Sequence, residues 1–340
     1  TGFKGSWLCL WLQHLGANVT GFALSPPTIP NLFEQAEVAG NMTSIIGDIC
    51  DLSAIREVME QTRPEIVFHL AAQALLGYSY HNPIETYQTN VMGTLNVLEN
   101  MRSCGSVRSA LMVTSDKCYE NKEWLWGYRE NDALGGYDPY SSSKACAEIL
   151  ISSYRNSYFP NHLYHQHKTA IASARAGNVI GGGDFADDRL IPDIIRALVN
   201  KEMVNIRNPT AIRPWQHVLE PLSGYLQLAE KLYTEGIDCA EGWNFASHAT
   251  DAKPVEWIVQ KMLAYWGENK GWKIENSQNP HEAHYLKLDC SKAMAKLNWQ
   301  PHYNLENALE KTVSWYKAEQ EGVDMKAFTL KQIMDYQERL

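Results

Sequence analysis

Apolar runs of strand length alternate with segments of helical spacing through the first half of the chain. Short apolar runs predict buried strands, and apolar residues that recur every three or four positions predict amphipathic helices. The predicted helices cover residues 5–16, 52–63, 83–104 and 139–159, and the predicted strands cover 18–24, 43–49, 64–72, 109–115 and 169–179. Such alternation predicts an α/β fold with a doubly wound parallel sheet that helices cover on both faces.

The pattern loosens after residue 177, where GGGD, RNP and tryptophan-rich pieces separate short helical stretches. We expect a first domain over residues 1–176 and a smaller α/β domain, mainly for the substrate, over 177–340. The sequence shows no clean linker between them, so we expect the two domains to interleave. A segment near 211–235 is expected to return to the first domain.

Composition narrows the class of protein. The 340 residues are 45% hydrophobic, which suffices for a large core. The net charge is −9 with scattered Lys and Arg, which argues against a nucleic-acid partner. The seven cysteines are far apart, as is typical of a reducing compartment, and no apolar run reaches membrane-spanning length. We therefore expect a cytoplasmic protein with no membrane partner.

The opening TGFKG precedes the first predicted helix. Gly2 and Gly5 have the spacing of the last two glycines in a Gly-x-x-Gly-x-x-Gly turn, which lets backbone approach a pyrophosphate at a helix N-terminus. A plain helix-entry turn is the alternative. Because a doubly wound sheet should open with a strand, we expect the sequence shown to begin after that strand.

A tyrosine and a lysine lie four positions apart in PYSSSK, at the start of the helix over 139–159. At this spacing Tyr140 and Lys144 project from one helix face. A nearby ammonium favours the tyrosinate, so Tyr140 could act as a base near working pH. Tyr164 and Lys168 have the same spacing, but no hydroxyl-bearing strand end precedes them as Ser115 precedes the first pair.

The strand over 109–115 runs into the polar residues of VTSDKCYEN. Asp116 and Lys117 stand side by side where this strand stops. They could form a surface ion pair, or they could supply an acid and a base to one site. The second interpretation requires a local departure from strand geometry, because neighbours on a regular strand point to opposite faces.

Several longer strings carry a resemblance to a known family. They are HLAAQ at 69–73, TSDKCY at 114–119, PYSSSK at 139–144, RAGNVIGGGD at 175–184 and IRPWQHVLEPLSGY at 212–225. Together they resemble the extended short-chain dehydrogenase/reductase superfamily, whose larger domain has a Rossmann-like fold. Within it the chain is most similar to the CDP-glucose 4,6-dehydratases, and the likeness covers essentially the whole chain.

The resemblance implies an NAD-dependent lyase that acts on a small-molecule nucleotide sugar, as in O-antigen biosynthesis. The sugar is oxidised at C4, loses water across C5 and C6, and is reduced at C6, which gives a 4-keto-6-deoxy product. It also implies a homodimer, or a dimer of dimers, through the helices over 83–104 and 139–159. An NDP-sugar 4-epimerase and a non-catalytic NAD-binding scaffold remain as alternatives. The acid and amine at the strand end argue against the first, and the intact Tyr–Lys pair argues against the second.

Roles carry over from the resemblance position by position. Tyr140 is the implied base at O4, with Lys144 as its partner and Ser115 as the hydroxyl that positions O4. Asp116 would protonate the hydroxyl leaving C6, and Lys117 would act at C5. The implied cofactor-binding residues are Gly2, Phe3, Gly5, Asp48, Ile49, Ala71, Ala72, Gln73, Asn90, Thr114, Tyr140 and Lys144. The implied substrate-binding residues are Asn178, Arg189, Arg213 and His217.

Some of these expectations have open alternatives. Asp48 could simply cap a turn, and each arginine could have a plain surface role. The second strand ends with Ser25, where an acidic residue would hold the ribose of NAD, so the preference for NAD rests on the resemblance. Histidines cluster at 162–167 and at His281 and His284, but no carboxylate or cysteine accompanies them, and we expect no metal.

Overall fold

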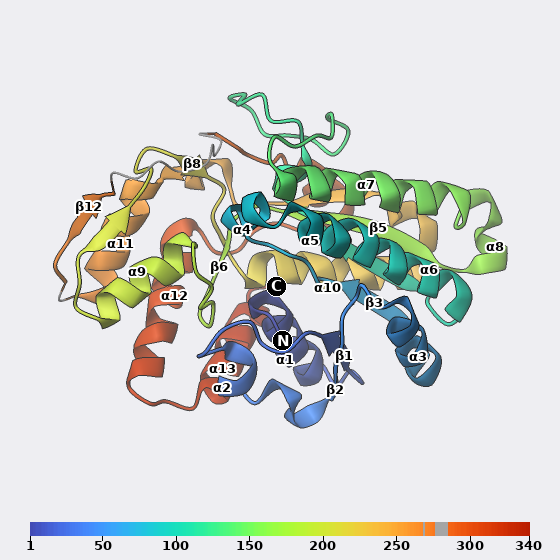
Figure 1. The fold of residues 1–340 in the computed structure, drawn as a ribbon, viewed down its shortest axis with the longest axis horizontal. Helices are drawn as coiled ribbons and strands as arrows, with labels where there is room; N and C mark the ends of the chain where they lie inside the picture. The colour runs from blue at the N-terminus through green and yellow to red at the C-terminus, as the bar shows by residue number, and fades with distance from the viewer. Residues whose placement is uncertain (268, 276–284) are drawn as a thin grey trace.

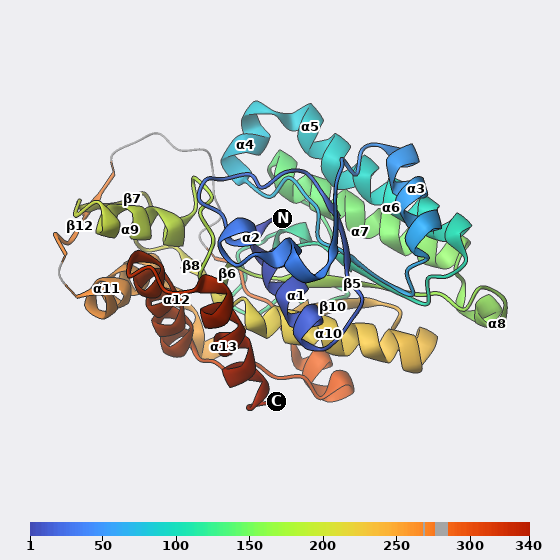
Figure 2. The same cartoon turned by 90° about the horizontal axis from the view of Figure 1, so that it is seen from below.

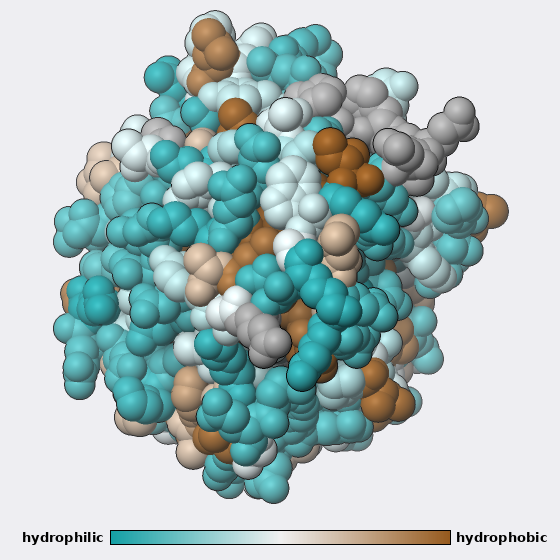
Figure 3. All heavy atoms as spheres, turned by 90° about the vertical axis from the view of Figure 1, so that its left-hand side faces the viewer, coloured by the Kyte–Doolittle hydropathy of each residue, from teal (hydrophilic) through white to brown (hydrophobic). Residues whose placement is uncertain are grey.

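The computed structural model describes residues 1–267, 269–275 and 285–340. His281 and His284 therefore lie outside the described residues. None of the described helices is long and apolar enough to cross a membrane. The face over α9 (Leu190–Val199) and α11 (Val255–Trp266) is mostly hydrophilic, with separate apolar patches (Figure 3).

Four parallel strands form the central sheet. They stand in the order β10-β5-β4-β3, with β3 over Ile66–His69, β4 over Ser109–Val113, β5 over Ala170–Ala176 and β10 over Gly242–Phe245. Every residue of β4 and β5 is buried, as expected for a sheet covered on both faces. The doubly wound α/β class is confirmed.

The sequence pattern did not predict β10, which comes from the second half of the chain. Helix α10 (Leu219–Thr234) also comes from that half and packs against β4 and β5. Ser109 Oγ on β4 donates a hydrogen bond of 2.9 Å to the carbonyl oxygen of Ala229 on α10. The division at residue 176 stays a prediction, and these contacts support the return of the segment near 211–235.

The opposite face of the sheet carries the two long helical segments. They are α5 (Pro83–Tyr87) with α6 (Thr94–Cys104), and α7 (Pro139–Ser157), which run side by side (Figure 1). The view from below shows α10 on the other side of the strands (Figure 2). Between α5 and α6 the backbone forms a π-helical segment, η2 (Gln88–Gly93), where the sequence predicted one regular helix. Such segments often occur at functional sites.

The remaining elements surround this core. Strands β1 (Thr20–Ala23) and β2 (Thr43–Ile46) form a separate parallel pair. Helix α1 (Phe3–His14) packs against α13 (Met325–Gln337) in the largest apolar cluster. The other helices are α2 (Leu32–Gln35), α3 (Leu52–Thr62), α4 (Leu76–His81), α8 (Tyr164–His167) and α12 (Leu305–Gln320), and the other strands are β6 (Val179–Ile180), β7 (Val204–Ile206), β8 (Ile212–Arg213), β9 (Gln216–His217), β11 (Lys253–Pro254) and β12 (Trp272–Ile274).

Candidate active site

The chain leaves strand geometry directly after β4. Ser115 caps a short 3-10 turn over Asp116–Cys118, and its Oγ accepts a hydrogen bond of 3.2 Å from the amide of Lys117. The same hydroxyl donates to Asp116 Oδ1 at 3.0 Å. This turn is the departure from strand geometry that an acid and an amine need if they are to serve one site.

The carboxyl group of Asp116 is held in an unusual state. Its side chain is buried, and its Oδ2 atom has no hydrogen-bond partner in the described part of the chain. Burial raises the pKa of Asp116, while the charge of Lys117 and the hydrogen bond from Ser115 oppose that rise. The environment therefore shifts this carboxyl group toward its protonated form.

The pair at 140 and 144 lies at the beginning of α7. Asp138 caps this helix by accepting a hydrogen bond of 2.8 Å from the amide of Ser141. Both members of the pair are buried, and Lys144 Nζ donates to the carbonyl oxygen of Val113 at 3.4 Å. The amine therefore reaches the end of β4, two residues before Ser115.

Burial changes the pKa of both members of the pair. It raises the pKa of Tyr140 to about 12, and a hydrogen-bonding interaction with Ser115 opposes the rise. It lowers the pKa of Lys144 to about 8, and the negative charge of Glu148 opposes the fall. The structure therefore brings Ser115, Tyr140 and Lys144 together, with an amine that titrates close to neutral pH.

The second Tyr–Lys pair lies elsewhere. Tyr164 belongs to α8, which follows the far end of α7 (Figure 1), and Lys168 adopts a left-handed backbone conformation with φ of 52° just after it. Since α7 has 19 residues, about 28 Å of helix separates its two ends. This pair is not part of the site at the end of β4.

The N-terminus of α1 is open for an anion. Gly2 precedes the helix without a side-chain cap, and a Cβ added at Gly2 or Gly5 would meet no atom within 4 Å. Phe3 lies close to Gly181, whose added Cβ would be 3.2 Å from its ring. Free amide groups at a helix start bind phosphate oxygens, so this turn fits the pyrophosphate of a dinucleotide.

Sequence reasoning missed Lys4 in this turn. Its Nζ lies 5.7 Å from the ring centre of Tyr225, whose buried hydroxyl has no hydrogen-bond partner among the described residues. Burial lowers the pKa of Lys4 to about 8; the positive charges of Arg189 and Lys144 lower it further, and Asp116 opposes them. A lysine between two glycines of a phosphate-binding turn was a signal that could have found it.

Asn90 forms hydrogen bonds that connect Gln73, another predicted cofactor-binding residue, with helix α7. It lies in the π-helical segment, where its Oδ1 accepts from the amide of Gln73 at 2.9 Å and its Nδ2 donates to Ser143 Oγ at 2.9 Å. Ala71 and Ala72 lie between β3 and this contact and are partly buried. Thus η2 orders the segment after β3 against α7.

Asp48 and Ile49 follow β2. Asp48 Oδ1 accepts a hydrogen bond of 2.8 Å from the amide of Cys50. This contact caps the turn, which is the alternative role that the sequence left open for Asp48. Ile49 is buried against Gly93, where an added Cβ would be 2.5 Å from its Cδ1 atom. Contact of either residue with adenine stays a prediction.

A cavity of about 570 Å³ opens beside the 3-10 turn, and Lys117, Tyr119, Asp138 and Arg213 help to line it. Arg213 is buried, and its charge reaches Asp116. Of the four predicted substrate-binding residues, Arg213 is the one that lines this cavity.

The other predicted substrate residues lie in three different environments. Arg189 pairs with Asp184 at 2.8 Å, within electrostatic range of Tyr140. The carbonyl oxygen of Asn178 accepts from the amide of Gln216 at 2.9 Å. His217 is fully buried beside aromatic rings, and its Nε2 has no described partner. For these three residues substrate contact stays a prediction.

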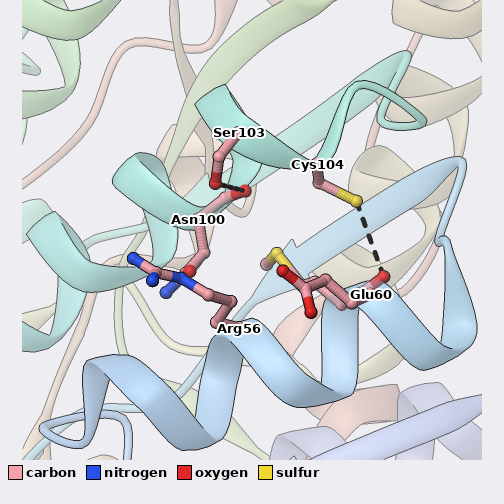
Figure 4. Close-up of a pocket in the computed structure, with 6 residues that line it drawn as sticks. Arg56, Glu60, Asn100, Ser103 and Cys104 are labelled. Carbon is pink, nitrogen blue, oxygen red and sulfur yellow. Dashed lines mark hydrogen bonds between the residues drawn. The ribbon is translucent and has the colours of Figure 1, made fainter.

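A second hollow lies away from the site, between α3 and α6 (Figure 4). It measures about 20 Å³ and is lined by Arg56, Glu60, Asn100, Ser103 and Cys104 among others. This is room for about one water molecule, so the hollow is no candidate for a substrate.

A model of the GDP-mannose 4,6 dehydratase family matches residues 1–312. The chain belongs to this family. The likeness to sugar-nucleotide 4,6-dehydratases is thereby confirmed.

Individual members of this dehydratase family show the degree of similarity. The chain is 55% identical over 336 residues to the CDP-glucose 4,6-dehydratase of Salmonella typhimurium, covering 99% of this chain and 94% of that protein. It is 26% identical to the dTDP-glucose 4,6-dehydratase of Haemophilus influenzae, over 79% and 81% of the two chains.

Solved structures show the fold. The structure of dTDP-glucose 4,6-dehydratase from Bacillus anthracis in complex with NAD has a TM-score of 0.77 at 20% identity, over 95% of this chain and 96% of that chain. The UDP-glucose 4-epimerase of Thermotoga maritima has a TM-score of 0.79 at 20% identity, over 94% and 96%. Dehydratases and epimerases therefore share the fold, so the fold alone does not distinguish between the two reactions.

Proposed function

We propose that the protein catalyses the NAD-dependent dehydration of CDP-glucose to CDP-4-keto-6-deoxyglucose. The observation that carries this proposal is the 55% identity, over 99% of the chain, to a CDP-glucose 4,6-dehydratase. The buried acid and the amine at the end of β4 support it, because a dehydration across C5 and C6 needs both.

The residues present fit NAD. Gly2, Phe3 and Gly5 would hold its pyrophosphate at the start of α1, and Tyr140 and Lys144 would lie beside its nicotinamide ribose. When bound, NAD supplies the oxidant at C4 and the reductant at C6. All other chemistry falls to side chains of this protein.

At C4 the tyrosinate of Tyr140 would take the proton from O4 while Ser115 orients that hydroxyl. Burial opposes ionisation of Tyr140, so a nearby cation is required. Arg189 acts on Tyr140 as such a cation, and we propose that Lys144, one turn further along α7, would supply a second. Its Nζ donates to the carbonyl oxygen of Val113.

At C5 and C6 the turn after β4 would act. Asp116 would give its proton to the hydroxyl that leaves C6 as water, which suits a buried carboxyl whose pKa is raised. Lys117 borders the cavity and would take the C5 proton or stabilise the enolate by its charge. In this proposal the oxidation at C4 would fall to residues of α7, and the elimination would fall to residues of the 3-10 turn.

An assay against a panel of nucleotide sugars tests the proposal. Incubation with CDP-glucose should produce the ultraviolet chromophore that a 4-keto product shows in alkali, and dTDP-glucose, UDP-glucose and GDP-mannose should produce far less. An epimerase would yield a new sugar without that chromophore, and a scaffold would leave CDP-glucose unchanged. Either outcome would overturn the proposal.

We also propose a homodimer in the cytoplasm. The long helical segments present exposed apolar side chains, among them Ile84 at 73%, Met92 at 48% and Ile149 at 58% exposure. A four-helix contact between two copies would cover them. Light scattering of the purified protein should give twice the chain mass, or four times if dimers pair.

A further inference from the structure

Glu148 makes several buried polar contacts close to the Tyr140–Lys144 pair, and the mechanism described above gives it no role. It lies on α7 one turn beyond Lys144 and is buried, with 2% exposure. Thr114 Oγ1 donates to its Oε1 at 2.5 Å, and Ser173 Oγ donates to its Oε2 at 2.8 Å. Arg175 Nη2 donates to the same Oε2 at 2.7 Å, which makes a buried salt bridge.

The salt bridge is itself anchored. Arg175 Nη1 donates to the hydroxyl of Tyr119 at 2.7 Å, and that hydroxyl donates to Asn244 Oδ1 on β10 at 2.7 Å. Tyr119 lines the cavity beside Lys117. One chain of buried contacts therefore joins α7, the end of β4, β5, β10 and the cavity wall.

Lys144 needs an opposite charge because it is buried near other basic groups. The titratable groups within electrostatic range of it are Glu148 on its own helix, Cys118 from the 3-10 turn, His69 from β3 and Lys4 from α1. Burial keeps the thiol of Cys118 and the imidazole of His69 neutral, with a pKa of about 3 for His69. Among these four groups, Glu148 supplies the negative charge, and residues four apart on a helix are neighbours.

We propose that Glu148, partnered by Arg175, is a positioning residue for the reaction: it keeps the amine of Lys144 charged and fixes it at the end of β4 through Thr114. This inference rests on the proposed function, which gives Lys144 its role beside Tyr140. Arg175 comes from β5, whereas Glu148 lies on the same helix as Lys144, and the charge of Glu148 is the one that acts on Lys144.

Two substitutions that break the same salt bridge separate this role from a structural one. Glu148→Gln removes the anion and leaves the cation, so Lys144 should lose its proton at lower pH. Arg175→Met removes the cation, so Lys144 should keep its proton to higher pH. We expect the basic limb of kcat/KM against pH to move by about one unit in opposite directions. A purely structural salt bridge predicts weaker folding for both and no opposite movement.

Three further variants control the measurement. Lys144→Met should abolish the basic limb and so assign it. Glu148→Asp keeps the charge and should keep the limb in place. The double variant Glu148→Gln/Arg175→Met is neutral again and should bring the limb back toward the wild-type position. It also replaces any single variant that fails to fold. The inference would be overturned if the basic limb of the kcat/KM profile stayed in place, or moved in the same direction, in folded Glu148→Gln and Arg175→Met.

A measurement without substrate distinguishes this failure from failure of the proposed function. Since the pKa of folded Lys144 is lowered to about 8, the unfolded chain holds this proton to higher pH, and the wild type should gain stability over Lys144→Met as pH rises above about 8. The onset of that gain should move down in Glu148→Gln and up in Arg175→Met. If these shifts appear but no CDP-glucose is converted, only the proposed function fails. If conversion is normal and the onset is the same in all folded variants, only the inference fails.

Discussion

Two buried carboxyl groups flank the end of β4 and are treated in opposite ways. Glu148 accepts from Thr114, Ser173 and Arg175, and these donors and the charge of Arg175 outweigh burial to lower its pKa. Asp116 has one oxygen without a described partner, and burial raises its pKa. Two consecutive residues after β4 donate the hydrogen bonds: Thr114 donates to Glu148, and Ser115 donates to Asp116. A saturated carboxylate supports structure and charge, and an unsatisfied one is ready to exchange a proton.

The largest effect should come from Asp116→Asn. The amide has the same shape but cannot protonate the leaving hydroxyl, so product formation should fall by about 10²–10⁴-fold. Quenched single-turnover assays with CDP-glucose measure it. The unfolding midpoint should stay close to that of the wild type, which shows that the loss is chemical. A variant with near-normal turnover would remove Asp116 from the mechanism.

Glu148→Gln should have the largest effect on stability. Arg175 would remain buried without its counter-charge, so the free energy of unfolding should fall by about 3–5 kcal/mol. Urea denaturation followed by tryptophan fluorescence measures it. The double variant Glu148→Gln/Arg175→Met should recover part of the loss. A loss under about 1 kcal/mol for the single variant would show that the pair is not a structural necessity.

Substitutions of Lys117 distinguish between two roles for the amine that lies next to Asp116. If Lys117 is a neutral base at C5, Lys117→Met should block elimination, and Lys117→Glu should restore about a tenth of it because a carboxylate can also take a proton. If Lys117 is a cation that stabilises the enolate, Glu should be as inactive as Met. Single-turnover product formation separates the two hypotheses, provided that both variants keep the wild-type circular dichroism spectrum.

The smallest effect is a difference between Asp116 and Glu148 in how their contributions to the unfolding free energy change with pH. The pKa of Asp116 is raised on folding, so its contribution to stability is present at low pH and is lost as pH rises from about 4 through the folded pKa. The pKa of Glu148 is lowered, so its contribution is present above about 4.5 and is lost as pH falls through the folded pKa. Unfolding free energies relative to Asp116→Asn and Glu148→Gln should therefore change with opposite sign between about pH 3 and 6. Slopes of equal sign would contradict the contrast.

The parts of this site that depend on local spacing could be predicted from the sequence. Tyr140 and Lys144 share a face because a helix repeats every 3.6 residues, and Ser115 marks a strand end because an apolar run stops there. The central strands β3, β4 and β5 follow from the same rule. The departures from regular geometry could not be predicted: the π-helical segment differs from an α-helix over a single turn and leaves no distinct apolar period.

The missed elements depend on contacts between distant residues. β10 is four residues long and contains a buried polar residue, Asn244, which is satisfied by Tyr119 and by carbonyl groups from two loops. Glu148 stands in an amphipathic helix, where a glutamate is normally exposed. Its burial follows from Arg175, which is 27 residues away on β5. Lys4 was not predicted because the recognised role of this turn belongs to Gly2 and Gly5, which lie on either side of it.

The late position of β10 in the chain has a consequence for biosynthesis. Until residues 242–245 leave the ribosome, β5 is the outer strand of the growing sheet. The backbone groups that later pair with β10 are then unpaired along an alanine-rich strand whose one charged side chain is Arg175. An open strand edge of this kind can pair with strands of other chains. We therefore expect chains that stop near residue 240 to associate through β5, and synthesis of this protein to depend on chaperones during the interval before β10 arrives.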